Sequence, residues 1–318
     1  DIWANTVYID PLAQIARKGQ STPTNAIYYE TFLQAALIAD QLGYHSQAAE
    51  WRDRAEGVKD QINTLLFLSD QQRYLTGIYQ SQEVSPTIYA QAWPLAYGIV
   101  EPDSLVSVIQ AFQELLNPDP ESTNIGIYGL YWVLEGYGKY GYFSDAIELI
   151  ENYYGWLLDN GATTWCEGFD KNSYAGARSH GWGSSPPWFL TTHVLGARQT
   201  GPESWQVSPS FDGVDSVRGA LPLPDGVLNI YWENNICPTN YLDIEAPMTT
   251  SGLAIIPDSF DDTILLNGEF IWHAGVALIE GIEAIEGNIY IPLGGGTHQI
   301  SIVNSYNGSS NYRKYSCS

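Results

Sequence analysis

The spacing of apolar residues changes near Gly201, and this change constrains the fold more than any other feature of the sequence. From about residue 21 to 199, apolar side chains recur at steps of three and four, which is typical of one face of an α-helix. After Gly201 the apolar runs are short or alternating and are separated by turns, which is typical of β-strands. Helices followed by strands indicate two packed modules rather than an alternating α/β fold.

The first part of the chain predicts about seven helices. Long stretches with the helical period are Thr24–Gly43, a segment opening at Ser46, a segment after Pro102, and Phe143–Leu157; shorter ones are Ser85–Trp93, Gly126–Tyr137 and Pro186–Leu195. We expect Gly43 to end the first helix, and Pro94 to end or kink the helix over Ser85–Trp93. Short connections favour antiparallel hairpins, and six hairpins would make an (α/α)6 toroid of about twelve helices. The expected fold is therefore mainly α, a partial toroid, with an appended β domain.

The second part predicts a small antiparallel β-sandwich. Gly, Pro and Ser are dense up to residue 215, so we expect an α/α-toroid catalytic portion over 1–200, a linker over 201–215 and the sandwich over 216–318. Asn267-Gly268 is a hairpin turn signal. The predicted strands are Val227–Trp232, Leu253–Ile256, Thr263–Leu266, Phe270–Trp272, Ile289–Ile291 and Gln299–Val303.

The charge and composition exclude several classes of partner. A net charge of −23 disfavours nucleic acid and anionic membranes, and no apolar run reaches the roughly 20 residues of a membrane span. The chain begins at Asp1, so we expect a processed or truncated product. Few lysines, high acidity and the sequon at Asn307 favour a secreted glycoprotein. Cys166, Cys237 and Cys317 have no metal-site spacing, no cofactor is implied, and a disulfide, if present, is expected between Cys237 and Cys317.

Chemistry-bearing residues are densest between Gly161 and Trp188. This stretch runs from the end of one predicted helix to the start of another and holds two carboxylates, one imidazole and three indoles; they are Glu167, Asp170, His180, Trp165, Trp182 and Trp188. A carboxylate beside aromatic walls suits a general base next to a bound sugar ring. Each residue also has a structural alternative, because Glu167 could be a surface charge, Asp170 a turn cap, and the other side chains parts of the core.

The order of these residues resembles a known family. Gly161-Ala-Thr-Thr-Trp-Cys-Glu-Gly-Phe-Asp170 is similar to the "G-A-T-T-x-W-E-x-W-D" segment of inverting α-L-rhamnosidases, the six-hairpin glycosidases of family 78. Ser179-His-Gly-Trp182 resembles that family's downstream His motif, and Gly219–Trp232 resembles the entry to its C-terminal β-sandwich. The resemblance implies that Glu167 is the general base and that Asp170, His180, Trp165 and Trp182 bind substrate.

Two features depart from the family pattern. Cys166 and Phe169 stand where the family carries Trp, and we expect them to alter the pocket wall. The family's general acid lies in an upstream "D-E-R" loop, to which no segment of this chain is similar. The resemblance therefore implies release of terminal α-L-rhamnose from a glycoside or polysaccharide, with the acid supplied by a missing N-terminal half or a second chain.

Alternatives remain open at this point. The chain could be a truncated, non-catalytic carbohydrate-binding homologue, or another α/α-toroid glycosidase of the glucoamylase or trehalase type. It could also be a full enzyme whose acid is Asp10, Glu30 or Glu135.

Overall fold

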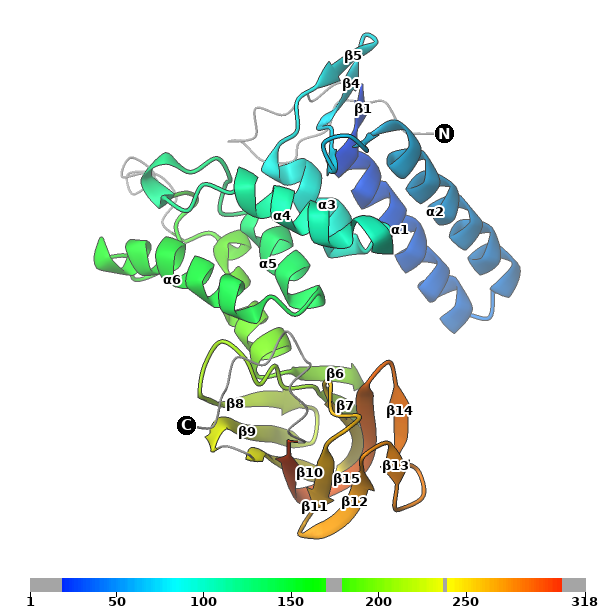
Figure 1. Ribbon diagram of the computed structural model, residues 1–318, viewed down its shortest axis with the longest axis vertical. Helices are drawn as coiled ribbons and strands as arrows, with labels where there is room; N and C mark the ends of the chain where they lie inside the picture. Colours follow the sequence, from blue (N-terminus) through cyan, green and yellow to red (C-terminus); the bar gives the residue numbers. More distant parts are fainter. Residues whose placement is uncertain (1–18, 170–178, 237–238, 305–318) are drawn as a thin grey trace. The chain divides into compact units, whose positions relative to one another are not determined.

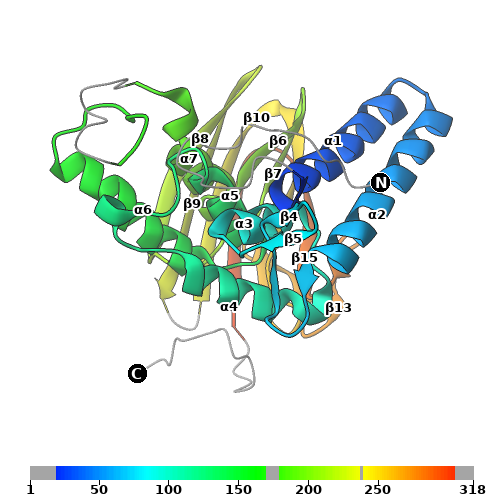
Figure 2. The same cartoon turned by 90° about the horizontal axis from the view of Figure 1, so that it is seen from above.

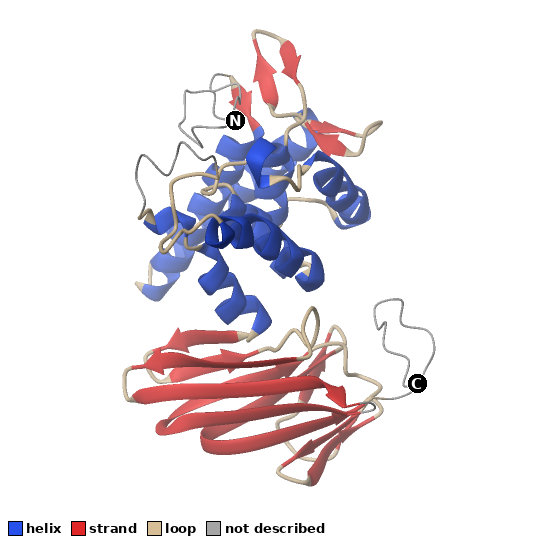
Figure 3. Cartoon of the chain, turned by 90° about the vertical axis from the view of Figure 1, so that its left-hand side faces the viewer, coloured by secondary structure: helices blue, strands red, loops and turns tan. Residues whose placement is uncertain are grey.

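The computed structural model describes residues 19–169, 179–236 and 239–304. The chain divides into two compact units, one made of residues up to 142 with 148–185, the other of residues 143–147 with those from 186 onward. We refer to them as the helical unit and the β unit. Figure 3 shows the strands of the ten-stranded sheet lying side by side.

Seven α-helices occur among the described residues, as the sequence predicts. They are α1 (Thr22–Gln41), α2 (His45–Leu65), α3 (Ile88–Tyr97), α4 (Leu105–Leu115), α5 (Leu130–Lys139), α6 (Phe143–Asp159) and α7 (Ser185–Phe189). Short 3-10 turns η1 (Pro102–Ser104), η2 (Pro120–Ser122) and η4 (Gly181–Gly183) precede some of them, and α7 continues as the π-helix η5 (Leu190–Val194). The mainly α fold with an appended β domain is confirmed.

Helices α1 and α2 form an antiparallel hairpin, and they lie side by side in Figures 1 and 2. Helix α1 ends at Gln41, and Gly43 follows with φ +80°, so the predicted glycine stop is confirmed. The buried side chains Ala36, Ala39 and Ala48 pack together in the hairpin. Because these side chains are small, the two helix backbones can approach closely.

The sequence predicts that Pro94 ends or kinks this helix. Helix α3 continues through Pro94 to Tyr97, so Pro94 does not end it. Gly98, with φ +70°, takes the terminating position instead. Every α3 residue from Ile88 to Ala96 is buried. Packing on all sides of the helix therefore offsets the backbone hydrogen bond that a proline cannot donate.

The helical unit also carries five short strands that the sequence did not predict. β1 (Gln20–Ser21), β4 (Gly77–Tyr79) and β5 (Gln82–Val84) form one antiparallel sheet, and β2 (Phe67–Leu68) pairs with β3 (Arg73–Tyr74). The fully buried Gln91 bonds both backbone groups of Tyr74, accepting from its N–H at 2.8 Å and donating to its carbonyl at 2.8 Å. Strands of two or three residues leave no apolar period to detect.

The β unit contains one ten-stranded sheet. Its strands are β6 (Ala197–Gly201), β7 (Ser204–Val207), β8 (Ser216–Leu223), β9 (Gly226–Ile236), β10 (Thr239–Ile256), β11 (Thr263–Leu266), β12 (Glu269–His273), β13 (Val276–Ala277), β14 (Glu283–Ile285) and β15 (Asn288–Val303). The pairing is antiparallel except between β7 and β10, which run parallel. Asn267 and Gly268 both have positive φ in the turn between β11 and β12, which confirms the predicted hairpin.

The two longest strands bend and take part in both halves of the sheet. β10 pairs with β9 through its first half and with β7 through its second, and β15 runs beside it throughout, with a register shift between Ala246 and Ser251. The two strands predicted over Ile289–Ile291 and Gln299–Val303 are thus one strand, β15. Its Gly294–Gly296 run looks like a turn in the sequence, but it lies opposite the bulge of β10.

Candidate functional site

Of the residues singled out in the sequence, Trp165, Glu167, His180 and Trp182 lie between α6 and α7 in the helical unit, and Trp188 lies within α7 in the β unit. Gly161, with φ +85°, redirects the chain after α6, and Ala162 N–H donates to Leu157 O at 3.0 Å. Farther along, His180 N–H donates to Trp165 O at 2.9 Å. Segments 161–169 and 179–185 are therefore held next to each other by a backbone hydrogen bond.

Close packing fixes the same pair of segments. A Cβ on Gly183 would lie 3.0 Å from Ile127 Cδ1 and 3.1 Å from Trp165 Cβ, so a larger residue would push the segments apart. The ring of Trp165 packs edge-on against Tyr154 of α6, with centroids 5.1 Å apart. This packing orients the half-buried indole of Trp165.

The carboxylate of Glu167 is exposed, whereas its neighbours point inward. Cys166 is 2% exposed and Phe169 is 1% exposed. The ring of Phe169 meets Tyr153 and Tyr154 edge-on, with centroids 4.9 and 5.7 Å apart. The two buried side chains anchor the segment and leave Glu167 facing solvent. Cys166 and Phe169, which stand where the family carries Trp, are therefore packed beneath the loop, and their expected effect on the pocket wall stays a prediction.

His180 and Trp182 form a stacked pair beside this segment. Their ring centroids are 4.8 Å apart and their planes differ by 14°. His180 Nδ1 and Trp182 Nε1 are shielded from solvent and have no hydrogen-bond partner among the described residues. A buried polar atom without a partner costs about 1–3 kcal/mol, so both nitrogens carry an unmet hydrogen-bonding capacity.

A series of aromatic rings that the sequence analysis did not single out supports Trp182. Tyr128 contacts Trp182 at 5.4 Å and Trp132 at 4.7 Å between centroids. Trp132 of α5 stacks on Trp93 of α3 at 4.2 Å, and its Nε1 donates to Tyr97 Oη at 2.8 Å. The aromatic residues clustered over Tyr128–Trp132 are visible in the sequence. Only the tertiary structure shows that Tyr128 contacts Trp182.

The alternative acids occupy different settings. Glu30 on α1 is half-buried, accepts a hydrogen bond from Gln34 Nε2 at 2.6 Å, and contributes with burial to the raised pKa of Tyr97. Glu135 on α5 is also half-buried. Glu167 has no hydrogen bond or ion pair with any described residue. Asp10 and Asp170 lie outside the described residues, as do Cys237, Cys317 and Asn307.

Two further observations concern metals and membranes. Within the described ranges, no group of three or more His, Cys, Asp or Glu side chains is arranged to hold a metal ion. In the same ranges, no helix combines the length and apolar character needed to cross a bilayer. Cys166 is a free thiol.

Solved α-L-rhamnosidases share this fold. The enzyme from Dictyoglumus thermophilum matches with a TM-score of 0.71 and 18% identity, over 95% of this chain and 34% of that one. The Streptomyces avermitilis enzyme, solved in complex with L-rhamnose, matches with a TM-score of 0.65 and 18% identity, over 87% of this chain and 26% of that one. The GH78 family rhamnosidase of a Bacillus species matches with a TM-score of 0.66 and 22% identity, over 79% of this chain and 28% of that one.

The chain spans about a quarter to a third of the length of these structures. No curated protein sequence matches it. The family model described as the bacterial α-L-rhamnosidase six-hairpin glycosidase domain matches residues 6–194, which is more than half of the chain. On this evidence, together with the helical fold that carries Glu167 and the His180–Trp182 pair, the chain belongs to the bacterial α-L-rhamnosidase six-hairpin glycosidase family.

Proposed function

We propose that the chain is part of a glycoside hydrolase that releases terminal α-L-rhamnose, with Glu167 as the general base. The observation that carries the proposal is the exposed Glu167 carboxylate, held between two buried anchors on the loop that also presents the unpaired nitrogens of His180 and Trp182. Membership of the family supports the reaction class. The L-rhamnose complex of the Streptomyces avermitilis enzyme supports the choice of sugar.

In the proposed mechanism Glu167 removes a proton from a water molecule on one face of the sugar. A second carboxyl group on the opposite face protonates the departing oxygen, and the two groups stand about 6.5–9.5 Å apart to leave room for the water. This arrangement inverts the anomeric configuration. His180 Nδ1 and Trp182 Nε1 would bond sugar hydroxyls, with Trp165 and Asp170 completing the binding site.

We propose that the acid comes from an upstream segment of the enzyme. No segment of the sequence is similar to the loop that carries the general acid in this family. A chain lacking its acid should bind L-rhamnose yet hydrolyse no rhamnoside, which also keeps a purely sugar-binding role as the second candidate function. Hydrolysis by the chain alone, abolished by Glu30→Gln or Glu135→Gln, would contradict an upstream acid.

Glu167→Gln tests the base, because it keeps the size and removes the charge. Hydrolysis of 4-nitrophenyl α-L-rhamnoside should fall at least about 100-fold, the lower end of general acid–base help, while L-rhamnose affinity is retained. The longer enzyme is used if the chain alone shows no turnover, and proton NMR of the first product tests inversion. Exposed Glu148 on α6 gives the matched control, Glu148→Gln. Unchanged turnover in Glu167→Gln would exclude it as the base.

We also propose a secreted location, which the net charge of −23 and the sequon at Asn307 favour. Expression in a glycosylating host should add a mass that Asn307→Gln removes. A wild-type mass equal to that of the bare chain would count against glycosylation.

A further inference from the structure

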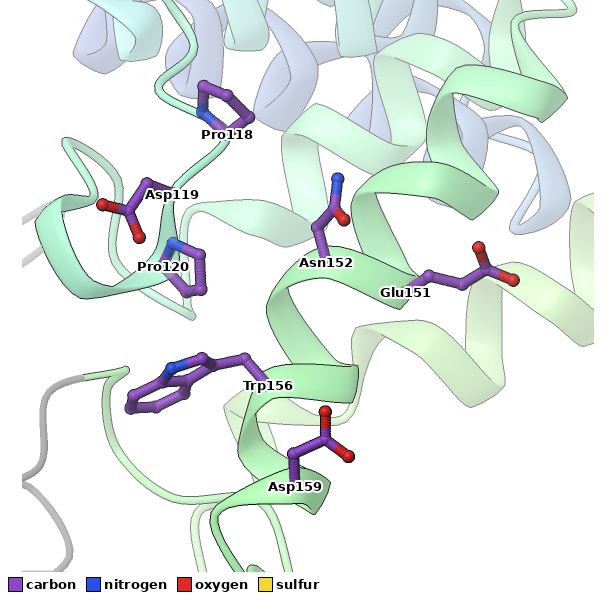
Figure 4. A pocket seen from close by; sticks show the side chains of 7 residues that line it. All are labelled: Pro118, Asp119, Pro120, Glu151, Asn152, Trp156 and Asp159. Carbon is purple, nitrogen blue, oxygen red and sulfur yellow. The ribbon is translucent and has the colours of Figure 1, made fainter.

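A pocket of about 500 Å³ lies in the helical unit between α6 and the loop that follows α4. The loop contributes Pro118, Asp119 and Pro120, and α6 contributes Asn152, Trp156 and Asp159. Figure 4 shows the indole of Trp156 extending from α6 toward the loop, and Glu151, a further lining residue, pointing away from it. No residue of this pocket belongs to the site proposed around Glu167.

The loop wall is fixed by its own hydrogen bonds. Asn117 Nδ2 donates to Ser122 O at 2.7 Å, and Asp119 accepts from Glu121 N–H at 3.0 Å and from Ser122 Oγ at 2.7 Å. Those two bonds hold the pKa of the Asp119 carboxyl below its usual range, so the carboxyl is ionised at neutral pH. The loop is therefore ordered before any ligand arrives.

Hydrogen bonds also join the loop wall to α6. The hydroxyl of Tyr153 donates to Asn117 O and lies 3.0 Å from Thr123 Oγ1. Trp156 Nε1 donates to Glu121 Oε1 at 3.3 Å, which fixes the half-buried indole. A pocket whose two walls are joined in this way needs little reordering to bind, and preorganisation of this kind favours affinity.

The side chains that line the pocket indicate which class of ligand it can bind. An indole and two prolines offer apolar surfaces for the C–H face of a sugar ring. Carboxylates accept hydrogen bonds from sugar hydroxyls, and the Asn152 amide both donates and accepts. No Lys or Arg lines the pocket among the described residues, while Asp119, Glu151 and Asp159 make it negative, which repels anionic sugars.

We propose that this pocket is a second sugar-binding site, specific for neutral saccharides, with Trp156 as the stacking platform. It does not depend on the chemistry proposed for Glu167. A site of this kind would hold a neutral polysaccharide on the enzyme independently of turnover.

The test follows the indole N–H of Trp156 in 15N-labelled chain, with its resonance assigned by its loss in Trp156→Phe. A neutral rhamnan oligosaccharide should shift this resonance, and polygalacturonate should not. Trp156→Ala should weaken oligosaccharide binding in calorimetry by roughly threefold to tenfold, the range expected for a lost aromatic contact, and Trp156→Phe should restore part of it. Exposed Asn152→Ala, which removes no buried group, should also weaken binding.

Trp182→Ala separates this proposal from the proposed function. It should reduce binding at the site near Glu167 and leave the Trp156 shift intact. The proposal is overturned by an unshifted Trp156 resonance, by equal binding of polygalacturonate, or by a shift that calcium chloride alone reproduces, which would indicate a cation site.

Discussion

The imidazole of His180 and the indole of Trp182 stack with centroids 4.8 Å apart and planes within 14° of parallel. One nitrogen of each ring is shielded from water and without a partner among the described residues. Tyr128 packs on Trp182 and links the pair to Trp132 of α5. Contacts with these two aromatic side chains thus fix the position of the pair, and two of its nitrogens keep an unmet hydrogen-bonding capacity.

Removal of the imidazole should weaken sugar binding. His180→Ala is expected to lower affinity for L-rhamnose by roughly threefold to tenfold, the cost of one hydrogen bond, measured by calorimetry. Trp182→Phe keeps an aromatic ring but removes the N–H, and should give a loss of similar size. His273→Ala in the β unit is the matched control. If His180→Ala and Trp182→Phe both bind L-rhamnose as wild type does, the pair is structural.

The raised pKa of Tyr97 predicts that the protein loses stability at high pH. Burial and, to a lesser extent, nearby charge raise the pKa of Tyr97 to about 12, whereas an unfolded tyrosine has a pKa of about 10. Between these values the unfolded state loses a proton that the folded state keeps, so this stability is complete below pH 10 and falls as pH rises toward 12. The free energy of unfolding, measured with urea, should fall between pH 9 and pH 11. This fall should be smaller by about 1 kcal/mol in Tyr97→Phe than in wild type. Exposed Tyr241→Phe is the control, and identical decreases in all three proteins would contradict the prediction.

Replacement of two adjacent glycines at the bend, Gly294 and Gly295, by alanine should affect the stability of the β unit differently. A Cβ on Gly295 would overlap Pro247 O and Met248 Cα, whereas a Cβ on Gly294 would have nothing within 4 Å. Gly295→Ala should therefore destabilise the β unit by about 1–3 kcal/mol, and Gly294→Ala should change it little. Urea unfolding followed by tryptophan fluorescence checks both, and equal stability of the two variants would show that the bend tolerates a side chain.

The local backbone features that the sequence predicted correctly are those set by one or two residues. Gly43 and Asn267-Gly268 need positive φ, and glycine or asparagine reaches that region at little cost. Two expected chain breaks did not occur, a helix end at Pro94 and a turn between the strands predicted over Ile289–Ile291 and Gln299–Val303, because tertiary packing outweighed the local signal. Burial around α3 outweighed the proline, and the bulge of β10 needed a glycine-rich partner where the sequence looked like a turn.

The candidate site divides in the same way. Glu167, His180 and Trp182 could be named because they share one continuous motif region. Tyr128 and Trp93 could not, because their roles depend on rings that meet across three separate segments. The roles of Asp170 and of Glu167 itself, and the domain limits at 200 and 215, stay predictions.

The course of β10 and β15 through the bend has a consequence for unfolding. Each strand forms hydrogen bonds in both halves of the sheet, so separating one half would break the ladder that supports the other. Amide protons on the two sides of the bend should then exchange with solvent at similar rates, through a single cooperative opening.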